Sequence, residues 1–172
     1  MQDVIHKKYQ ELAGIYKEGR TLKTDVWQET RDHDEAPIEA DDYLEILPDL
    51  VAKAKDKGLN VKQGSIEEIP YADKTFDTVI DTSTIDHTPE YKKVISEYRR
   101  VLKDDGKLLL VAWNNRLPTI QDGGDLSGGA QYYFNLEEFK EALEGKFRII
   151  SEEVLRDANP KLLVFYLCVP IC

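Results

Sequence analysis

The stretch from Lys107 to Trp113 limits most strongly what this chain can fold into. It contains five consecutive apolar residues, Leu108-Leu109-Leu110-Val111-Ala112. A strand with one face in water alternates apolar and polar residues, whereas an unbroken run is typical of a strand covered on both faces. Such a strand lies inside a parallel sheet, between two layers of helices. The run therefore predicts an α/β fold.

A long amphipathic helix is predicted just before that strand. Thr88-Pro89 is typical of a helix start, and six apolar residues follow at the spacing of one helix face. They are Tyr91, Val94, Ile95, Tyr98, Val101 and Leu102. The turn Asp104-Asp105-Gly106 then separates the helix from the strand. This order is typical of the units that build a parallel sheet.

The rest of the chain predicts one α/β domain over residues 1–172. Residues 1–42 are predicted to form a helical cap and a polar, acidic linker, and residues 43–172 a mostly parallel sheet with antiparallel C-terminal strands. Six strands are predicted, within Tyr43–Leu47, Val61–Gln63, Phe76–Asp81, Lys107–Trp113, Phe147–Val154 and Leu162–Val169. Further helices are predicted over Val4–Tyr16, Pro48–Lys57 and Leu136–Leu143.

The composition argues against nucleic acid and membranes as binding partners. The 33 acidic residues exceed the 23 basic ones, and the resulting charge of -10 opposes nonspecific binding to nucleic acid. No apolar run approaches the roughly 20 residues of a membrane span, and the N-terminus lacks the apolar stretch of a signal peptide. We therefore expect a cytoplasmic protein that contacts neither nucleic acid nor membrane. With three histidines and no Cys/His cluster, no metal site is expected.

Two segments in the middle of the chain resemble a known family. Residues 64–80 read GSIEEIPYADKTFDTVI, and residues 98–110 read YRRVLKDDGKLLL. They resemble the class I S-adenosylmethionine-dependent methyltransferases, in the small-molecule branch that includes ubiquinone-biosynthesis enzymes. That branch carries G-D-A-x-x-L-P-F-x-D-x-S-F-D-x-V, then R-V-L-K-P-G-G before a strand. The resemblance extends from about Tyr43 to the C-terminus and is most specific from Gly64 to Trp113. It implies a Rossmann-like sheet, S-adenosylmethionine as cofactor and a small-molecule methyl acceptor.

The resemblance also implies site residues at the carboxyl ends of the strands, where such folds bind ligands. Gly64, Ser65 and Ile66 match the place where family members bind the adenine, although an aspartate is usual at the Ser65 position. Asp81, Thr82 and Ser83 match the loop that touches the methionine part of the cofactor.

Asp86 and His87 are the catalytic candidates, with His87 as a possible general base. The alternatives are a histidine that only bonds a carbonyl group and an aspartate that favours helix entry by its charge.

One expected motif is absent. The family's first strand leads into a G-x-G-x-G turn, but no glycine lies between Gly19 and Gly58. Two alignments with the family's strands are possible, which we call registers. In one register, Tyr43–Leu47 is the family's first strand, and the βα unit that should follow it is lost near Ile46. In the other, it is the second strand, Glu45 is the ribose-binding carboxylate, and the first strand is lost. Both registers predict a sheet shortened by about one βα unit.

Three functional hypotheses follow from the motif and its gap. The first is a methyltransferase acting on a small molecule. The second is a degenerate, noncatalytic relative that binds a ligand or a protein partner, and the third is a shortened form of an active enzyme. Loss of a helix would expose an apolar face, which the N-terminal helix or a second copy in a homodimer would have to cover.

Overall fold

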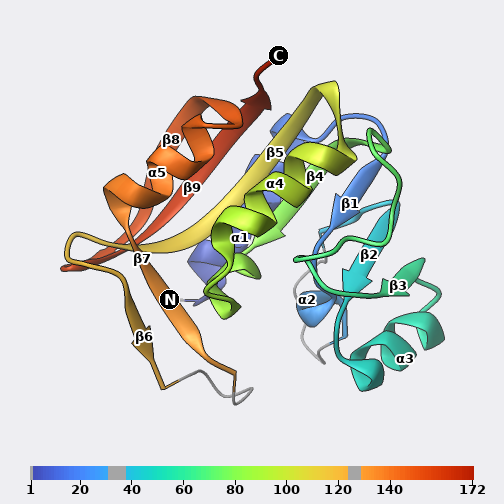
Figure 1. The fold of residues 1–172 in the computed structure, drawn as a ribbon. Coiled ribbons are helices and arrows are strands. Elements are labelled where there is room, and N and C mark those ends of the chain that lie inside the picture. Colours follow the sequence, from blue (N-terminus) through green and yellow to red (C-terminus); the bar gives the residue numbers. More distant parts are fainter. Residues whose placement is uncertain (1, 31–37, 124–128) are drawn as a thin grey trace.

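The computed structural model describes residues 2–30, 38–123 and 129–172. Within them, nine strands form one sheet that carries helices on both faces (Figure 1). The strands are β1 (Thr21–Lys23), β2 (Asp42–Glu45), β3 (Val61–Gln63), β4 (Phe76–Thr82), β5 (Leu102–Asn115), β6 (Ile120–Asp122), β7 (Gln131–Asn135), β8 (Phe147–Ala158) and β9 (Lys161–Pro170). The helices are α1 (Gln2–Tyr16), α2 (Trp27–Thr30), α3 (Pro48–Asp56), α4 (Tyr91–Val101) and α5 (Leu136–Glu144), with the short 3-10 helix η1 at Ile85–His87.

Strand β5 is covered on both faces, as its apolar run predicts. Leu108, Leu110 and Ala112 belong to the core cluster that includes residues of α4 and α5. Leu109 and Val111 belong to the opposite cluster, which includes residues of α1. Successive side chains of a strand point to opposite faces, so five apolar residues in a row pack into the hydrophobic clusters on both faces of the sheet. The predicted α/β fold is confirmed.

The sheet has a parallel part and an antiparallel part. Strands β3, β2, β1, β4 and β5 lie side by side in that order, and every neighbouring pair is parallel. Beyond β5, strand β9 runs antiparallel to it and β8 runs antiparallel to β9. The predicted antiparallel pair of C-terminal strands is therefore confirmed. Three strands were not predicted from the sequence, namely β1, β6 and β7.

Strand β1 shows which strand of the family the segment Tyr43–Leu47 corresponds to. It lies in the segment expected to be a linker and pairs with β2 on one side and β4 on the other. The prediction that the first strand is lost is therefore wrong, and so is the register that makes Tyr43–Leu47 the first strand. The second register holds for Glu45, which ends the second strand. Leu22 is the only apolar residue of β1, although Thr21 and Lys23 are also buried, so the sequence shows no apolar run there.

The first βα unit is present but short. Strand β1 has three residues and α2 has four, which is a single helical turn. The next unit has a nine-residue helix, α3, that starts at Pro48 and joins β2 to its parallel neighbour β3. Proline suits this first helical position because its missing N–H would have no partner there.

Helix α1 covers the sheet within the same chain. Leu12 and Ala13 are buried in one cluster with Ile80, Val111 and Phe165 of the sheet. This confirms that the N-terminal helix can act as a cover, whereas a homodimer stays a prediction. Within the described residues, no helix combines the length and apolar character that crossing a membrane requires.

Candidate functional site

A pocket of about 500 Å³ opens at the carboxyl ends of the parallel strands. Ligands of open α/β sheets bind at this edge, and the volume is within the range of about 300–1,000 Å³ common for small-molecule sites. Seven of the nine residues predicted from the sequence line this pocket: Glu45, Gly64, Ser65, Ile66, Thr82, Ser83 and His87. Asp81 and Asp86 do not line it.

The strand order arranges the lining residues along the pocket. Ser65 follows β3, Glu45 ends β2, Asp25 follows β1 and Thr82 ends β4. These strands are adjacent in that order, so the four side chains come from successive positions along one edge. The pocket therefore has an end near β3 and an end near β1 and β4.

Glu45 is held by the backbone around it. Its Oε1 accepts hydrogen bonds from the N–H groups of Ile46 (2.9 Å) and Leu47 (3.0 Å), and its Oε2 accepts one from Val26 (3.4 Å). Burial raises the pKa of this carboxyl above its usual value, and the N–H donors oppose that shift. The side chain is thus fixed beside the pocket with one oxygen, Oε2, only weakly engaged.

Gly64 is required by close packing behind the pocket. A Cβ atom there would lie 2.9 Å from the Pro70 side chain and 3.2 Å from Leu44. Ser65 then starts a tight turn, in which its Oγ accepts a hydrogen bond from the Glu67 N–H at 3.1 Å. The carboxylate of Glu67 accepts a hydrogen bond from the Thr88 hydroxyl at 2.5 Å, which connects this turn to the loop before α4.

Asp81 holds the loop after β4 instead of facing the pocket. It is fully buried and accepts hydrogen bonds from the N–H groups of Thr84 (2.6 Å) and Ile85 (3.1 Å) and from the Tyr98 hydroxyl. Burial raises the pKa of the Asp81 carboxyl to about 7, against the opposing effect of these donors. The prediction that Asp81 touches the cofactor is not supported by this position, because its oxygens are occupied within the fold.

Asp86 also has a position that differs from the one expected. It is fully buried, and its two oxygens lie 3.0 and 3.1 Å from the N–H of Trp113, so the side chain ties η1 to β5. Burial and the nearby charge of Asp81 raise its pKa well above the usual value. Asp86 therefore holds the loop and does not line the pocket, and its catalytic role stays a prediction.

His87 follows Asp86 directly in the chain and, unlike Asp81 and Asp86, lines the pocket. Its Nδ1 lies 3.0 Å from the carbonyl oxygen of Ala130. A carbonyl oxygen can only accept, so we assign the ring proton to Nδ1, which leaves Nε2 as the acceptor in the neutral ring. The bond to a carbonyl was the alternative left open by the sequence, and it is compatible with a base at Nε2.

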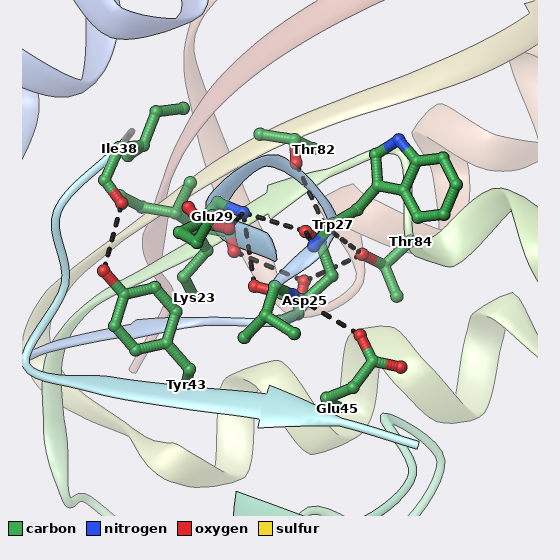
Figure 2. Close-up of polar contacts among 12 residues, drawn as sticks. Lys23, Asp25, Trp27, Glu29, Ile38, Tyr43, Glu45, Thr82 and Thr84 are labelled. Atoms are coloured by element: carbon green, nitrogen blue, oxygen red, sulfur yellow. Dashed lines mark hydrogen bonds and ion pairs between the residues drawn. The ribbon is translucent and has the colours of Figure 1, made fainter. Parts of the chain in front are cut away.

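A buried ion cluster replaces the expected glycine turn (Figure 2). Lys23 is fully buried, and its Nζ donates to Asp25 Oδ1 (2.8 Å), to Glu29 Oε2 (3.1 Å) and to the carbonyl oxygen of Asp25 (3.2 Å). The other carboxylate oxygen of Asp25 accepts from the hydroxyls of Thr82 (3.2 Å) and Thr84 (2.9 Å). The turn from β1 to α2 is thus bonded to the end of β4.

The charge of Lys23 influences the pKa values of both carboxyl groups in this cluster. Burial alone would raise the pKa of the Asp25 carboxyl, but the charge and hydrogen bond of Lys23 outweigh burial and lower it. For Glu29, burial prevails over the attraction to Lys23 and raises the pKa. Sequence reasoning missed this cluster because charged residues in an acidic, glycine-free segment look like a solvated linker. A lysine followed within six residues by two acids was the only available signal.

Comparisons with known proteins agree with this geometry. A family model described as "Methyltransferase domain" matches residues 38–110. The demethylmenaquinone methyltransferase of Alkalihalophilus pseudofirmus is 36% identical over 77 residues, which cover 45% of this chain and 32% of that protein. The chain matches only about a third of the length of the first curated relatives.

Solved structures resemble the chain over nearly its whole length. The PH0226 protein from Pyrococcus horikoshii aligns with a TM-score of 0.71 and 19% identity, covering 96% of this chain and 89% of that one. The 1,6-didemethyltoxoflavin-N1-methyltransferase of Burkholderia thailandensis, solved with bound 1,6-didemethyltoxoflavin and S-adenosylhomocysteine, aligns with a TM-score of 0.68 and 12% identity, covering 97% of this chain and 78% of that one. At these identities the likeness establishes the fold.

Proposed function

We propose that the chain is a class I S-adenosylmethionine-dependent methyltransferase, which binds S-adenosylmethionine and methylates a small molecule. The pocket at the carboxyl edge carries this proposal, since it brings Glu45, Ser65 and Thr82 together from three strands. Two of the similar proteins are named as a demethylmenaquinone methyltransferase and a 1,6-didemethyltoxoflavin-N1-methyltransferase, which favours a small-molecule acceptor.

The residues of the pocket fit the adenosine part of the cofactor. The Glu45 carboxylate is a suitable acceptor for two ribose hydroxyls, and its Oε2 has only a long bond to Val26. Apolar side chains near the β3 end, among them Leu47, Leu50 and Ile66, suit a flat ring. The glycine-rich turn of the family is absent here. Asp25 therefore lines the pocket at the place where family members have glycines without a side chain.

The chain's contribution to the reaction is mainly positioning. When bound, S-adenosylmethionine supplies a methyl group on a positively charged sulfur, and that sulfur keeps the electron pair of the broken bond. The pocket holds donor and acceptor together, which can remove much of the entropic barrier. We propose that His87 Nε2 takes the proton that the acceptor loses, with Nδ1 held by Ala130. Asp86 positions the loop that carries His87 through Trp113.

Replacing Glu45 by glutamine tests the cofactor site. We expect Glu45→Gln to weaken the binding of S-adenosylmethionine by about tenfold or more, because hydrogen bonds to charged groups are worth about 1.5–3 kcal/mol. Isothermal titration calorimetry on the full chain measures both affinities. Glutamine keeps the size of the side chain and an oxygen for the Ile46 and Leu47 N–H groups, so the fold should persist.

The matched control is Glu141→Gln, an exposed carboxylate on α5 outside the pocket lining, which should leave the affinity unchanged. If neither S-adenosylmethionine nor S-adenosylhomocysteine gives heat at millimolar concentration, the proposed function is wrong. If Glu45→Gln binds as tightly as the parent, the ribose role of Glu45 is wrong.

A further inference from the structure

The pocket end near β1 and β4 has an unusual set of polar groups. We call it the tail end and define it by Asp25, Thr82, Ser83 and Thr84, which all line the pocket. If adenosine lies between β3 and β2, as proposed above, the tail end receives the part of the ligand attached to its sulfur. The chemistry of the tail end then decides which tails can bind.

Six backbone N–H groups around the tail end donate hydrogen bonds within the protein. In the turn after β1, the N–H groups of Thr24, Val26 and Trp27 donate to the Ile80 carbonyl, to Glu45 and to Asp25. In the loop after β4, the N–H groups of Ser83, Thr84 and Ile85 donate to the Val111 carbonyl and to the Asp81 carboxylate. Successive free N–H groups form the usual cradle for an anion. Here these six N–H groups already have acceptors.

The cation nearest the tail end in the chain, Lys23, already donates all its hydrogen bonds within the protein. No lysine or arginine is among the described residues that line the pocket. Lys23 lies behind the wall, fully buried, and an ammonium has three N–H bonds to give. All three have acceptors, two on Asp25 and one on Glu29. Among the described residues that line the pocket, a ligand carboxylate would therefore find no cationic partner.

The charged groups that do line the pocket are carboxylates. Asp25 forms part of the wall of the tail end, and Glu45 and Glu67 line the pocket towards β3. The Thr82 and Thr84 hydroxyls donate to Asp25, so toward a ligand their oxygens can only accept, and the Thr84 oxygen already accepts one hydrogen bond from the Thr24 hydroxyl. Acceptors and negative charge favour an ammonium or a sulfonium and disfavour a carboxylate.

We propose that the tail end selects a cationic tail without a carboxylate, so that the chain binds decarboxylated S-adenosylmethionine more tightly than S-adenosylmethionine. This inference rests on the proposed function, because it assumes that adenosine occupies the β3 end of the same pocket. Both compounds carry the same methyl group on the same charged sulfur, so the proposed reaction is unchanged.

Calorimetric titration of the full chain with four adenosyl compounds tests the proposal. S-adenosylmethionine and its decarboxylated form differ only in the carboxylate, and we expect the decarboxylated form to bind at least tenfold more tightly. S-adenosylhomocysteine, which lacks the charge on sulfur, should bind more weakly than S-adenosylmethionine. 5′-Methylthioadenosine, which lacks the tail, reports whether the adenosine part is bound.

A variant that adds a cation should reduce the preference. Gln28 lines the pocket on α2 and is only half-buried, so Gln28→Arg is expected to fold and to offer a partner to the carboxylate. The affinity for S-adenosylmethionine should rise, and the tenfold gap should close. Gln121→Arg, an exposed position on β6 outside the pocket lining, adds the same charge elsewhere and should leave the gap as it is.

The outcomes separate the two proposals. Tighter binding of the decarboxylated compound, together with a smaller gap in Gln28→Arg, supports the inference. Equal binding of both compounds, or tighter binding of S-adenosylmethionine, overturns it while the proposed function stands. Failure of all four compounds to bind overturns the proposed function and this inference with it.

Discussion

Replacing Lys23 by methionine is expected to lower the free energy of unfolding by about 3–5 kcal/mol. Lys23 is fully buried and is the only cation bonded to the side-chain carboxylates of Asp25 and Glu29 among the described residues. Methionine keeps most of the volume but leaves two carboxylates in a buried site without their counter-charge. Breaking a buried ion pair on one side is costly because the remaining charge has lost its solvent and its partner. Urea denaturation of parent and variant at pH 7 measures the difference.

Two further variants make this test specific. Lys103→Met removes a lysine from an exposed ion pair with Asp77, whose side chains are 43% and 31% accessible, and should cost less than about 1 kcal/mol. Adding Asp25→Asn and Glu29→Gln to Lys23→Met removes the uncompensated charges and should recover much of the loss. A cost for Lys23→Met within 1 kcal/mol of that for Lys103→Met would show that the cluster does not hold the first βα unit in place.

The free energy of unfolding should fall as the pH rises from 5 to 8. The pKa of Asp81 is about 7 in the folded chain, against 3.8 for the free group. Between these values the folded state keeps a proton that the unfolded state has released, so rising pH favours unfolding by up to about 1.4 kcal/mol per pH unit. Burial also raises the pKa of Asp86, Glu29 and Glu45, which gives the same sign.

Other carboxyl groups do not reverse this trend in the chosen window. Asp77, Asp104 and Asp157 have pKa values lowered by hydrogen bonds from lysine or arginine side chains. Lowered groups stabilise the fold above their unfolded pKa and lose that effect only in more acidic solution. Urea denaturation at pH 5, 6, 7 and 8 measures the slope, and Asp81→Asn should flatten it. A stability that rises over this range would contradict the buried, raised state of Asp81.

The sequence by itself determined the elements with strong periodic patterns. The apolar spacing that starts at Tyr91 and the run Leu108–Ala112 predicted α4 and the middle of β5, because an amphipathic helix and a strand covered on both sides have characteristic patterns. The turn predicted at Asp104-Asp105-Gly106 is wrong, because α4 ends at Val101 and β5 already begins at Leu102. The pattern around Gly64 led to the family and to most of the pocket residues. These predictions needed only local order and the rule that parallel strands end at one edge.

Only the tertiary structure decided how the first βα unit is built. Strand β1 has a single apolar residue, and its place between β2 and β4 comes from pairing with strands 20 or more residues away. Lys23, Asp25 and Glu29 look like solvated charges in the chain, and they are buried only because each neutralises another. Likewise, Asp81 and Asp86 follow the ligand-binding pattern in sequence, but their carboxylates bond inward to Tyr98 and Trp113. Local patterns do not encode which charges meet after folding, and those pairings hold the turn after β1 and the loop after β4 beside the pocket.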